Sequence, residues 1–444
     1  MISQHRNSVK CGPLKDRGTQ KMTQPIKYPW KIPPGFTYGW SITTLGARYE
    51  LLKSLGAGAN GEVALAMDHE TKTRVAIKRV SLDNGLSIVR EVRLLKALRG
   101  HSNVLQLHRI IPPTNPKFAE IYIVTQAMEA DLTKLFKQPE QLLEHHLAWF
   151  SYKLLHAVAI LHAKGILHRD IKPSNVFINE SCAMVLGDFG LARAMGDTGP
   201  SARKPVSSTQ TRHVCTRYWR PPEVILATSY SSVSPPRGKE AGGGDVKASM
   251  SPPTYGPPLD VWSTAGVMAE LFEMLLPLDE RRGTLFPGDY STQSPSHGVH
   301  EIRRDQLGMI IRVLGAPSPG KPVGGKNTWE AVAEEVAAYN PRAADFIRLA
   351  SGKERTDEEQ RSFWRKRFAG VSDPLLDLLL SMLCFRPEER ITAAEALRSP
   401  CFDVVRNADQ EAELVTATPV EDFAEGDLRA LLCEEIASLN PEVE

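Results

Sequence analysis

Two short segments near the middle of the chain constrain its fold most strongly, because together they gather four polar side chains of fixed type. The first is His168-Arg169-Asp170-Ile171-Lys172-Pro173-Ser174-Asn175, and Asp188-Phe189-Gly190 follows thirteen residues after its end. An aspartate that accepts a hydroxyl proton, an asparagine and a second aspartate that hold Mg²⁺, and a lysine near the phosphoryl group are what phosphoryl transfer requires. The fold must therefore place both segments in one loop system.

Composition is that of an ordinary globular protein. The chain has 444 residues, of which 42% are hydrophobic and 24% charged, and its formal net charge is +2. This length allows two or three domains, or one large domain with extensions. The balanced charge argues neither for nor against a polyanionic partner, and our prediction includes no nucleic-acid partner. No apolar stretch approaches the roughly 18 residues that a membrane span needs, so none is predicted.

Cysteine spacing and the N-terminal composition bear on location. The six cysteines lie far apart and form no Cys-x-x-Cys pair, which favours reduced thiols and a cytoplasmic or nuclear location. Residues 1–40 carry seven bases and one acid, Asp16, without an apolar signal core. A solvated basic arm is the favoured interpretation, and an organelle transit peptide is the alternative.

The spacing of apolar residues changes along the chain. Residues 49–77 alternate apolar and polar positions around glycines, which predicts strands joined by tight turns, and 104–124 indicate further strands. Helical spacing begins at 87–98 and dominates after Asp131. The longest helical segments are 145–161, 261–276 and 375–383. A strand-rich lobe followed by a larger helical lobe predicts an α+β, two-lobed fold with a ligand cleft between the lobes.

A glycine-rich segment lies between two of the predicted strands. It reads Gly56-Ala57-Gly58-Ala59-Asn60-Gly61-Glu62-Val63, and glycines let backbone amides approach phosphate oxygens. A dinucleotide-binding turn would look similar but should open directly into a helix. Here Val75-Ala76-Ile77-Lys78 follows as a strand, so a hairpin over phosphates is favoured. Lys78 needs an anion to hold it, and Glu91 on the predicted helix is the candidate, although it could also be an ordinary solvated helix residue.

With these motifs together, the chain resembles eukaryotic protein kinases from about Tyr49 to Phe402. The resemblance implies ATP and Mg²⁺ as cofactors. It makes Asp170 the catalytic base and Lys172 the residue that stabilises the transferred phosphoryl group. Asn175 and Asp188 would hold Mg²⁺. The implied ATP contacts are Gly56, Ala57, Gly58, Ala59, Asn60, Gly61, Val63, Ala76, Lys78 with Glu91, and Met128 at the hinge, beside Thr125 as the residue that gates the pocket behind adenine. Glu223 with Arg390, and Asp260 below the catalytic loop, would be structural.

Further motifs narrow the resemblance to proline-directed kinases, particularly the mitogen-activated protein kinases. They are Thr216-Arg217-Tyr218-Trp219-Arg220, Leu285-Phe286-Pro287-Gly288 and Leu314-Gly315-Ala316-Pro317. The implied domains are a basic extension at 1–48 and a kinase domain at 49–402, with lobes at 49–127 and 128–402 and a low-complexity insertion at 231–258. An acidic extension at 403–444 would pack on the kinase domain. Residues 411–444 hold ten acids against Arg429, so this extension is either simply solvated or a docking surface for basic motifs.

One departure from that family concerns the activating switch. The family carries Thr-x-Tyr, whereas this chain has Thr211-Arg212-His213. A phosphothreonine needs paired guanidinium groups, and Arg90, Arg169 and Arg193 stand where the family places them. We therefore expect a switch on Thr211 alone. A loop that is ordered without phosphorylation, with His213 simply packed, is the alternative.

The leading hypothesis is a monomeric serine/threonine kinase of the mitogen-activated type that acts on Ser/Thr-Pro sites and is activated by an upstream kinase. A cyclin-dependent-like kinase shares the motifs, but the acidic C-terminal extension speaks against it. A non-catalytic nucleotide-binding scaffold would typically have lost Lys78, Asp170 or Asp188, and none is lost.

Overall fold

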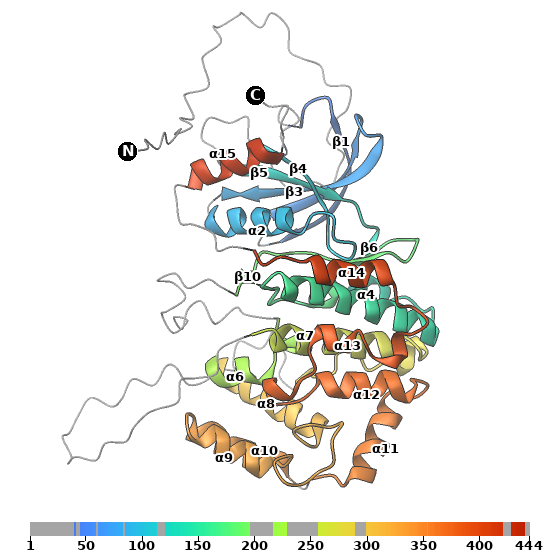
Figure 1. The fold of residues 1–444 in the computed structure, drawn as a ribbon, viewed down its shortest axis with the longest axis vertical. Helices are drawn as coiled ribbons and strands as arrows, with labels where there is room; N and C mark the ends of the chain where they lie inside the picture. Colours follow the sequence, from blue (N-terminus) through green and yellow to red (C-terminus); the bar gives the residue numbers. More distant parts are fainter. Residues whose placement is uncertain are drawn as a thin grey trace, which may run out of the picture. The chain divides into compact units, whose positions relative to one another are not determined.

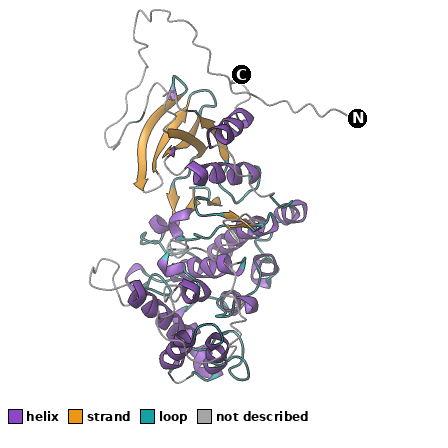
Figure 2. Ribbon diagram, turned by 90° about the vertical axis from the view of Figure 1, so that its left-hand side faces the viewer, coloured by secondary structure: helices purple, strands orange, loops and turns teal. Residues whose placement is uncertain are grey.

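The computed structural model describes residues 40, 45–58, 61–82, 85–112, 120–195, 216–228, 256–288, 299–352, 354–420 and 428–439. The chain divides into two compact units. The sheet unit comprises Met1–Lys96, Gln106–Ala127 and Ala424–Glu444, and the helical unit comprises Ala97–Leu105 and Met128–Phe423. Strands dominate the first and helices the second (Figures 1 and 2). The predicted α+β organisation is confirmed.

The sheet unit is built on five antiparallel strands in the order β1-β2-β3-β5-β4. Their bounds are β1 Tyr49–Gly58, β2 Gly61–Asp68, β3 Thr73–Ser81, β4 Leu107–Ile111 and β5 Glu120–Gln126. Strict alternation of burial along β2 shows that the two faces differ, as period-two geometry requires. One face buries an apolar cluster that includes Tyr49, Val75, Ile77 and Val124. The other face carries Lys78.

In the described part of the sheet unit, two helices accompany the strands. Helix α2 runs over Gly85–Ala97, close to the predicted 87–98, and α15 runs over Leu428–Leu439. Glu435 of α15 is buried and binds two bases of α2: its Oε1 lies 2.8 Å from Arg93 Nε, and its Oε2 lies 3.0 Å from Lys96 Nζ. The last helix of the chain is therefore bound to α2.

The helical unit is organised around α4 and α7, whose residues are buried almost throughout. Helices that are apolar on all sides belong in a core. The helices are α3 Leu132–Leu135, α4 Glu144–Ala163, α6 Pro222–Thr228, α7 Pro258–Glu273, α8 Val299–Leu314, α9 Trp329–Ala337, α10 Pro341–Ser351, α11 Asp357–Arg367, α12 Asp373–Met382, α13 Ala393–Ala396 and α14 Ala408–Thr416. The 3₁₀ turns are η2 Pro173–Asn175, η4 Arg217–Trp219, η5 Leu278–Glu280, η6 Pro387–Glu389 and η7 Pro400–Phe402. The predicted helices at 145–161, 261–276 and 375–383 correspond to α4, α7 and α12.

Five short strands bring the loops of the helical unit together. They are β6 Ala130–Asp131, β7 Ile166–Leu167, β8 Val176–Ile178, β9 Met184–Leu186 and β10 Arg193–Ala194. Strands β6, β8 and β9 form one small sheet, and β10 pairs with β7 in another. These ladders fix the segments that flank 168–175 and 188–190.

Several predicted features lie outside the described residues: most of the basic extension at 1–48, Ala59 and Asn60, the switch residues 211–213, the insertion from 231 to 255, and 421–427 and 440–444 of the acidic extension. Among the helices that the structure does describe, none has the length and apolarity to cross a membrane.

Candidate active site

Three glycines, Gly56, Gly58 and Gly61, lie at the facing ends of β1 and β2, which pair as an antiparallel hairpin. Gly56 pairs with Val63 and Gly58 with Gly61, so a strand follows the glycines and no helix opens there. Gly61 has a φ of +118°, and a Cβ at this position would collide with the backbone carbonyl of Arg79. Only glycine fits such a site without strain. The hairpin predicted from the sequence is therefore present, and the dinucleotide-binding turn is wrong.

Lys78 and Glu91 meet as an ion pair within the sheet unit. Lys78 Nζ of β3 lies 2.7 Å from Glu91 Oε1 of α2, and the Glu91 side chain is buried. The register places Val63 opposite Lys78, and Ala76 opposite Thr125 of β5. Since side chains two apart share a face of a strand, Val63, Ala76 and Lys78 project on the same side of the sheet. The predicted partner of Lys78 is thus correctly placed.

Met128 lies two residues after the end of β5 and is half-buried. It is the first residue of the segment 128–423, which belongs to the helical unit. Thr125, three residues earlier, is buried. Thr125 thus belongs to the sheet unit and Met128 to the helical unit, and their predicted roles beside adenine stay predictions.

Asp170 is the centre of a dense hydrogen-bond network in the helical unit. Lys172 Nζ donates to Asp170 Oδ2 at 2.6 Å, and Asn175 Nδ2 donates to the Asp170 carbonyl at 2.8 Å and to Oδ2 at 3.2 Å. The other carboxylate oxygen, Oδ1, accepts the Thr216 hydroxyl at 2.8 Å and the Thr216 amide at 3.2 Å. Three predicted site residues are therefore brought together, and Thr216 joins them.

Thr216 was not among the predicted site residues. It stood in the sequence only as the first residue of the motif 216–220, where nothing marked its hydroxyl as a partner of an aspartate 46 positions earlier. Its hydroxyl also accepts from Lys172 Nζ at 3.2 Å. Thr216 thus links the catalytic loop to the segment that precedes η4.

Asp260 of α7 holds the backbone of the loop that carries Asp170. The carboxylate of Asp260 is fully buried and accepts the backbone amides of His168 and Arg169, each at 2.8 Å, and the ring of His162 at 3.1 Å. Burial alone would raise the pKa of Asp260, but the hydrogen bond from His162 and the nearby positive groups keep it below its ordinary value. An ionised Asp260 stabilises the left-handed backbone of Arg169, whose φ is +68°.

Asp188 follows β9 with a left-handed φ of +60°. Its neighbour Gly187 donates its amide to the Asn175 carbonyl at 2.9 Å, and the Gly187 carbonyl lies 3.0 Å from His168 Nε2. These contacts tie the segment of Asp188 to the loop of Asn175. Among the residues that the structure describes, however, no hydrogen bond joins the Asp188 carboxylate to Asp170 or Asn175.

The donors of Asn175 and Asp188 fit a magnesium ion. Asn175 Nδ2 donates its hydrogen bonds to Asp170, so the side-chain oxygen Oδ1 of Asn175 can serve as a metal ligand. Asp188 supplies a carboxylate as a second ligand. Mg²⁺ prefers such hard oxygen ligands and is bound through one or two of them together with phosphate oxygens and water.

The predicted arginine cluster is described only in part. Arg193 of β10 pairs with Leu167, two residues before Arg169, so these two arginines come from neighbouring segments of the helical unit. Arg90 lies on α2 in the sheet unit. Thr211 lies outside the described residues, so its contact with the three arginines stays a prediction.

The segment after Thr216 is anchored by three further acidic side chains. Glu223 and Arg390 form the predicted buried ion pair through two contacts of 2.7 Å. Arg217 Nη2 lies 2.9 Å from Asp305 Oδ2 of α8, and Trp219 Nε1 donates to Glu270 Oε1 of α7 at 2.9 Å. Asp305 and Glu270 were not predicted as partners of this segment, since each is an unremarkable acid on a long helix.

Known proteins match almost the whole chain. A protein kinase domain model matches residues 49–235. Mitogen-activated protein kinase 16 of Oryza sativa subsp. japonica is 31% identical over 409 residues, covering 89% of this chain and 68% of that protein. Mitogen-activated protein kinase 17 of the same organism is 30% identical, covering 89% and 58%. Mitogen-activated protein kinase 10 of Arabidopsis thaliana is 28% identical, covering 90% and 86%.

Proposed function

The chain belongs to the mitogen-activated protein kinase family of serine/threonine protein kinases, and we propose that it transfers the γ-phosphate of Mg-ATP to Ser or Thr residues followed by Pro. The observation that carries the proposal is the network around Asp170. It combines a buried carboxylate, a lysine and an asparagine in the arrangement that positions a hydroxyl for attack and offsets charge on a transferring phosphoryl group. Residues 49–402 form the catalytic domain in this proposal.

Within the helical unit, Asp170 accepts the proton of the substrate hydroxyl. Its Oδ1 is oriented by Thr216 and its Oδ2 by Lys172 and Asn175, so the carboxylate has one fixed position. The Lys172 ammonium counters negative charge as the phosphoryl group moves. When bound, Mg²⁺ neutralises phosphate charge, and Asn175 and Asp188 would hold it.

Within the sheet unit, Lys78 contacts the ATP phosphates, and Glu91 fixes the lysine. The backbone amides of the hairpin from Gly56 to Gly61 cover the phosphates. Val63 and Ala76 contact adenine from the sheet, and the backbone of Met128 binds its edge. These assignments rest on the position of Val63, Ala76 and Lys78 on the same face of the sheet, where one ATP molecule could contact all three.

Preference for proline is proposed for the segment that Asp305, Glu270 and Glu223 anchor. A rigid segment can reject substrates that do not fit it, whereas a mobile one would adapt to many. The test is a peptide-library phosphorylation assay that compares Ser-Pro and Thr-Pro with Ser-Ala and Thr-Ala peptides. Equal rates on both sets would contradict proline preference without contradicting kinase activity.

Phosphorylation of Thr211 is the proposed switch. A phosphate there would pair with Arg90, Arg169 and Arg193 and would order the segments that carry them. We expect Thr211→Ala to lower the rate of peptide phosphorylation by about 100-fold, in line with charge-assisted pairing of a phosphate by several guanidinium groups. Mass spectrometry of the active protein checks occupancy. An active Thr211→Ala variant would favour the loop ordered without phosphorylation.

A docking surface for basic motifs is proposed on the acidic C-terminal extension. In α14, Asp409 is exposed, whereas Glu411 pairs with Arg406 and Glu413 with His101. Asp409 is thus the acid of this helix most open to a partner. Weaker binding of a basic peptide to Asp409→Asn than to wild type is expected, and unchanged binding would favour a simply solvated surface.

Two alternatives are separated by simple observations. A co-purifying cyclin would favour a cyclin-dependent-like kinase. Nucleotide binding without phosphate transfer would favour a scaffold. A monomeric state and a cytoplasmic or nuclear location complete the proposal, to be checked by light scattering and by imaging of a fluorescent fusion.

A further inference from the structure

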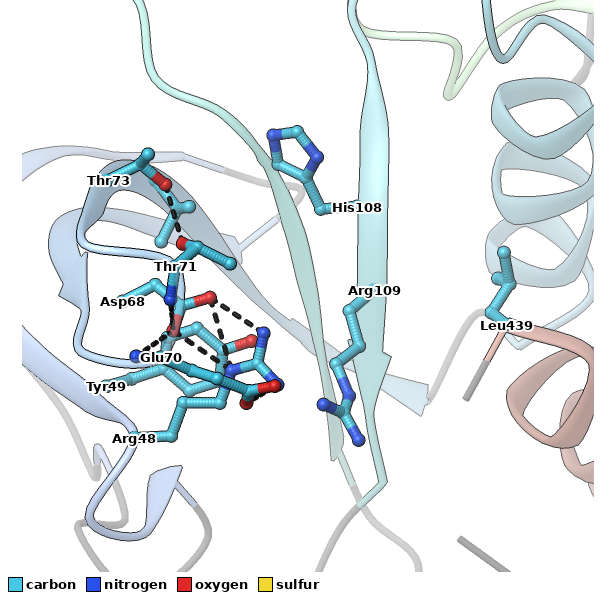
Figure 3. A pocket seen from close by; sticks show the side chains of 10 residues that line it. Arg48, Tyr49, Asp68, Glu70, Thr71, Thr73, His108, Arg109 and Leu439 are labelled. Carbon is cyan, nitrogen blue, oxygen red and sulfur yellow. Dashed lines mark hydrogen bonds and ion pairs between the residues drawn. The ribbon is translucent and has the colours of Figure 1, made fainter. Parts of the chain in front are cut away.

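We propose that the sheet unit holds a second ligand site, which takes a small molecule bearing a carboxylate or phosphate on a compact apolar body. The site is a pocket of about 300 Å³ at one end of the sheet. Figure 3 shows Arg48, Tyr49 and the 68–73 turn on one side of it, and His108 and Arg109 of β4 on the other. None of these residues has a role in the proposed kinase reaction.

The register places this pocket on the face of the sheet opposite Lys78. Arg109 pairs with Val124, and Val124 pairs with Ile77. Directly paired residues share a face, and consecutive residues of a strand point to opposite faces. Arg109 therefore projects on the side of Ile77 and Tyr49, and Lys78 projects on the other. An occupant of the pocket would not compete for the Lys78 ammonium.

The two carboxylates of the pocket are already engaged. Arg48 Nη2 lies 2.8 Å from Asp68 Oδ2, and Arg48 also pairs with Glu70. Asp68 further accepts the amide of Glu70 at 2.9 Å. Burial would raise the pKa of Asp68, but these hydrogen bonds and the Arg48 charge hold it below its ordinary value. Both acids are held by Arg48, and the charge of −1 that these three side chains keep is offset by Arg109, so the pocket as a whole does not favour a cationic ligand.

The pocket instead offers donors that lack acceptors. Tyr49 is 3% exposed, and its hydroxyl has no hydrogen-bond partner among the described residues. Burial raises the pKa of Tyr49, so the hydroxyl keeps its proton at neutral pH and remains a donor. The guanidinium of Arg109 makes no ion pair with any part of the chain that the structure describes. Arg109 is half-buried, whereas the Tyr49 hydroxyl is buried, and a buried donor left unsatisfied costs free energy that an anionic acceptor would restore.

The remaining walls define the rest of the ligand. The hydroxyls of Thr71 and Thr73 lie 2.7 Å apart. One therefore donates to the other, and one O–H is left for a ligand. Val75 and Leu439 add apolar surface. A guanidinium suits carboxylate and phosphate equally well through paired hydrogen bonds, and the volume lies at the lower limit of ligand pockets. The donors, apolar surface and volume of the pocket therefore suit a small organic anion.

The test is calorimetric titration of the full chain with phenyl phosphate and with benzoate at low ionic strength. Arg109→Ala should weaken binding of the preferred probe by about tenfold or more, and Tyr49→Phe by a smaller factor, because a charged hydrogen bond outweighs a neutral one. Arg74→Ala is the matched control, since Arg74 is exposed on the neighbouring β3 strand and does not line the pocket.

The relative affinities of the two probes show which anion the pocket takes, and the variants show whether the anion binds there at all. Tighter binding of phenyl phosphate identifies a phosphate site and tighter binding of benzoate a carboxylate site, provided that Arg109→Ala weakens it and Arg74→Ala does not. Arg109→Lys, which keeps the charge but loses the paired donors, should bind with intermediate affinity. No saturable binding of either probe, or binding that Arg109→Ala leaves intact, would overturn the proposal, because the anion would then have no site here.

Discussion

At the scale of single residues, the buried acids of the helical unit are distinguished by what they contact. Asp260 receives two backbone amides and a histidine, which favour its ionised form. Glu270 receives one hydrogen bond from Trp219 and lies near the acid Glu273; burial is the dominant effect and raises the pKa of Glu270 to about 8. At neutral pH, Asp260 is therefore ionised and Glu270 keeps its proton, although both acids lie on α7.

This difference makes stability depend on pH. The folded protein keeps a proton on Glu270 that the unfolded chain releases, so Glu270 stabilises the fold at low pH and loses this contribution as pH rises toward about 8. Glu270→Gln keeps a neutral acceptor for Trp219. We expect the variant to exceed wild type in free energy of unfolding by more than about 1 kcal/mol at pH 8.5, and to differ little at pH 5.

Urea unfolding at the two pH values measures this. Glu280→Gln serves as control, because Glu280 is an exposed acid in the turn after α7. If wild type and Glu270→Gln kept the same difference at both pH values, a neutral Glu270 would be contradicted.

At the scale of elements, the position of α2 depends on a helix from the other end of the sequence. Glu91 of α2 binds Lys78, while Arg93 and Lys96 of the same helix bind Glu435 of α15. The two sets of contacts involve residues a few positions apart on one helix. Since a helix moves as a unit, the α15 contacts restrict where Glu91 can lie.

Glu435→Ala should therefore loosen α2. Loss of two charged hydrogen bonds to a buried acceptor is expected to cost about 1–3 kcal/mol and to lower the rate of peptide phosphorylation, because Glu91 holds Lys78 less well. Hydrogen exchange in α2 should accelerate. The matched variant is Glu434→Ala: Glu434 is exposed and lies 3.8 Å from Arg93, and its loss should change stability by less than about 0.5 kcal/mol. Equal effects of both variants would contradict this role of Glu435.

At the scale of the whole molecule, local patterns predicted the parts of the fold that depend on neighbours in sequence. Alternation predicted the β1–β3 strands, and apolar periodicity predicted α4, α7 and α12. Short motifs identified Asp170, Lys172, Asn175 and the partner of Lys78. Site residues that belong to short motifs could therefore be predicted from the sequence alone.

What the sequence did not reveal depends on long-range pairing. Thr216 reaches Asp170, and Asp305 reaches Arg217 from 88 positions away. The pocket at Arg109 and Tyr49 likewise exists only because the strand register places the side chains of these two residues, one from β4 and one from β1, on the same face of the sheet. Neither residue belongs to a motif, and an arginine on an edge strand is usually a solvated one. Such sites are created by topology, which spacing along one chain does not encode.

Phosphoryl transfer is the activity that we propose for the Asp170 network. Its most direct test is the rate of ³²P transfer from labelled ATP to a Ser-Pro peptide by wild type and by Asp170→Asn, with Asp377→Asn, at an exposed position of α12, as control. Asp170→Asn preserves shape but cannot accept the proton, so its rate should fall by about 100-fold or more, while Asp377→Asn keeps the wild-type rate. An Asp170→Asn variant as fast as wild type would contradict the account.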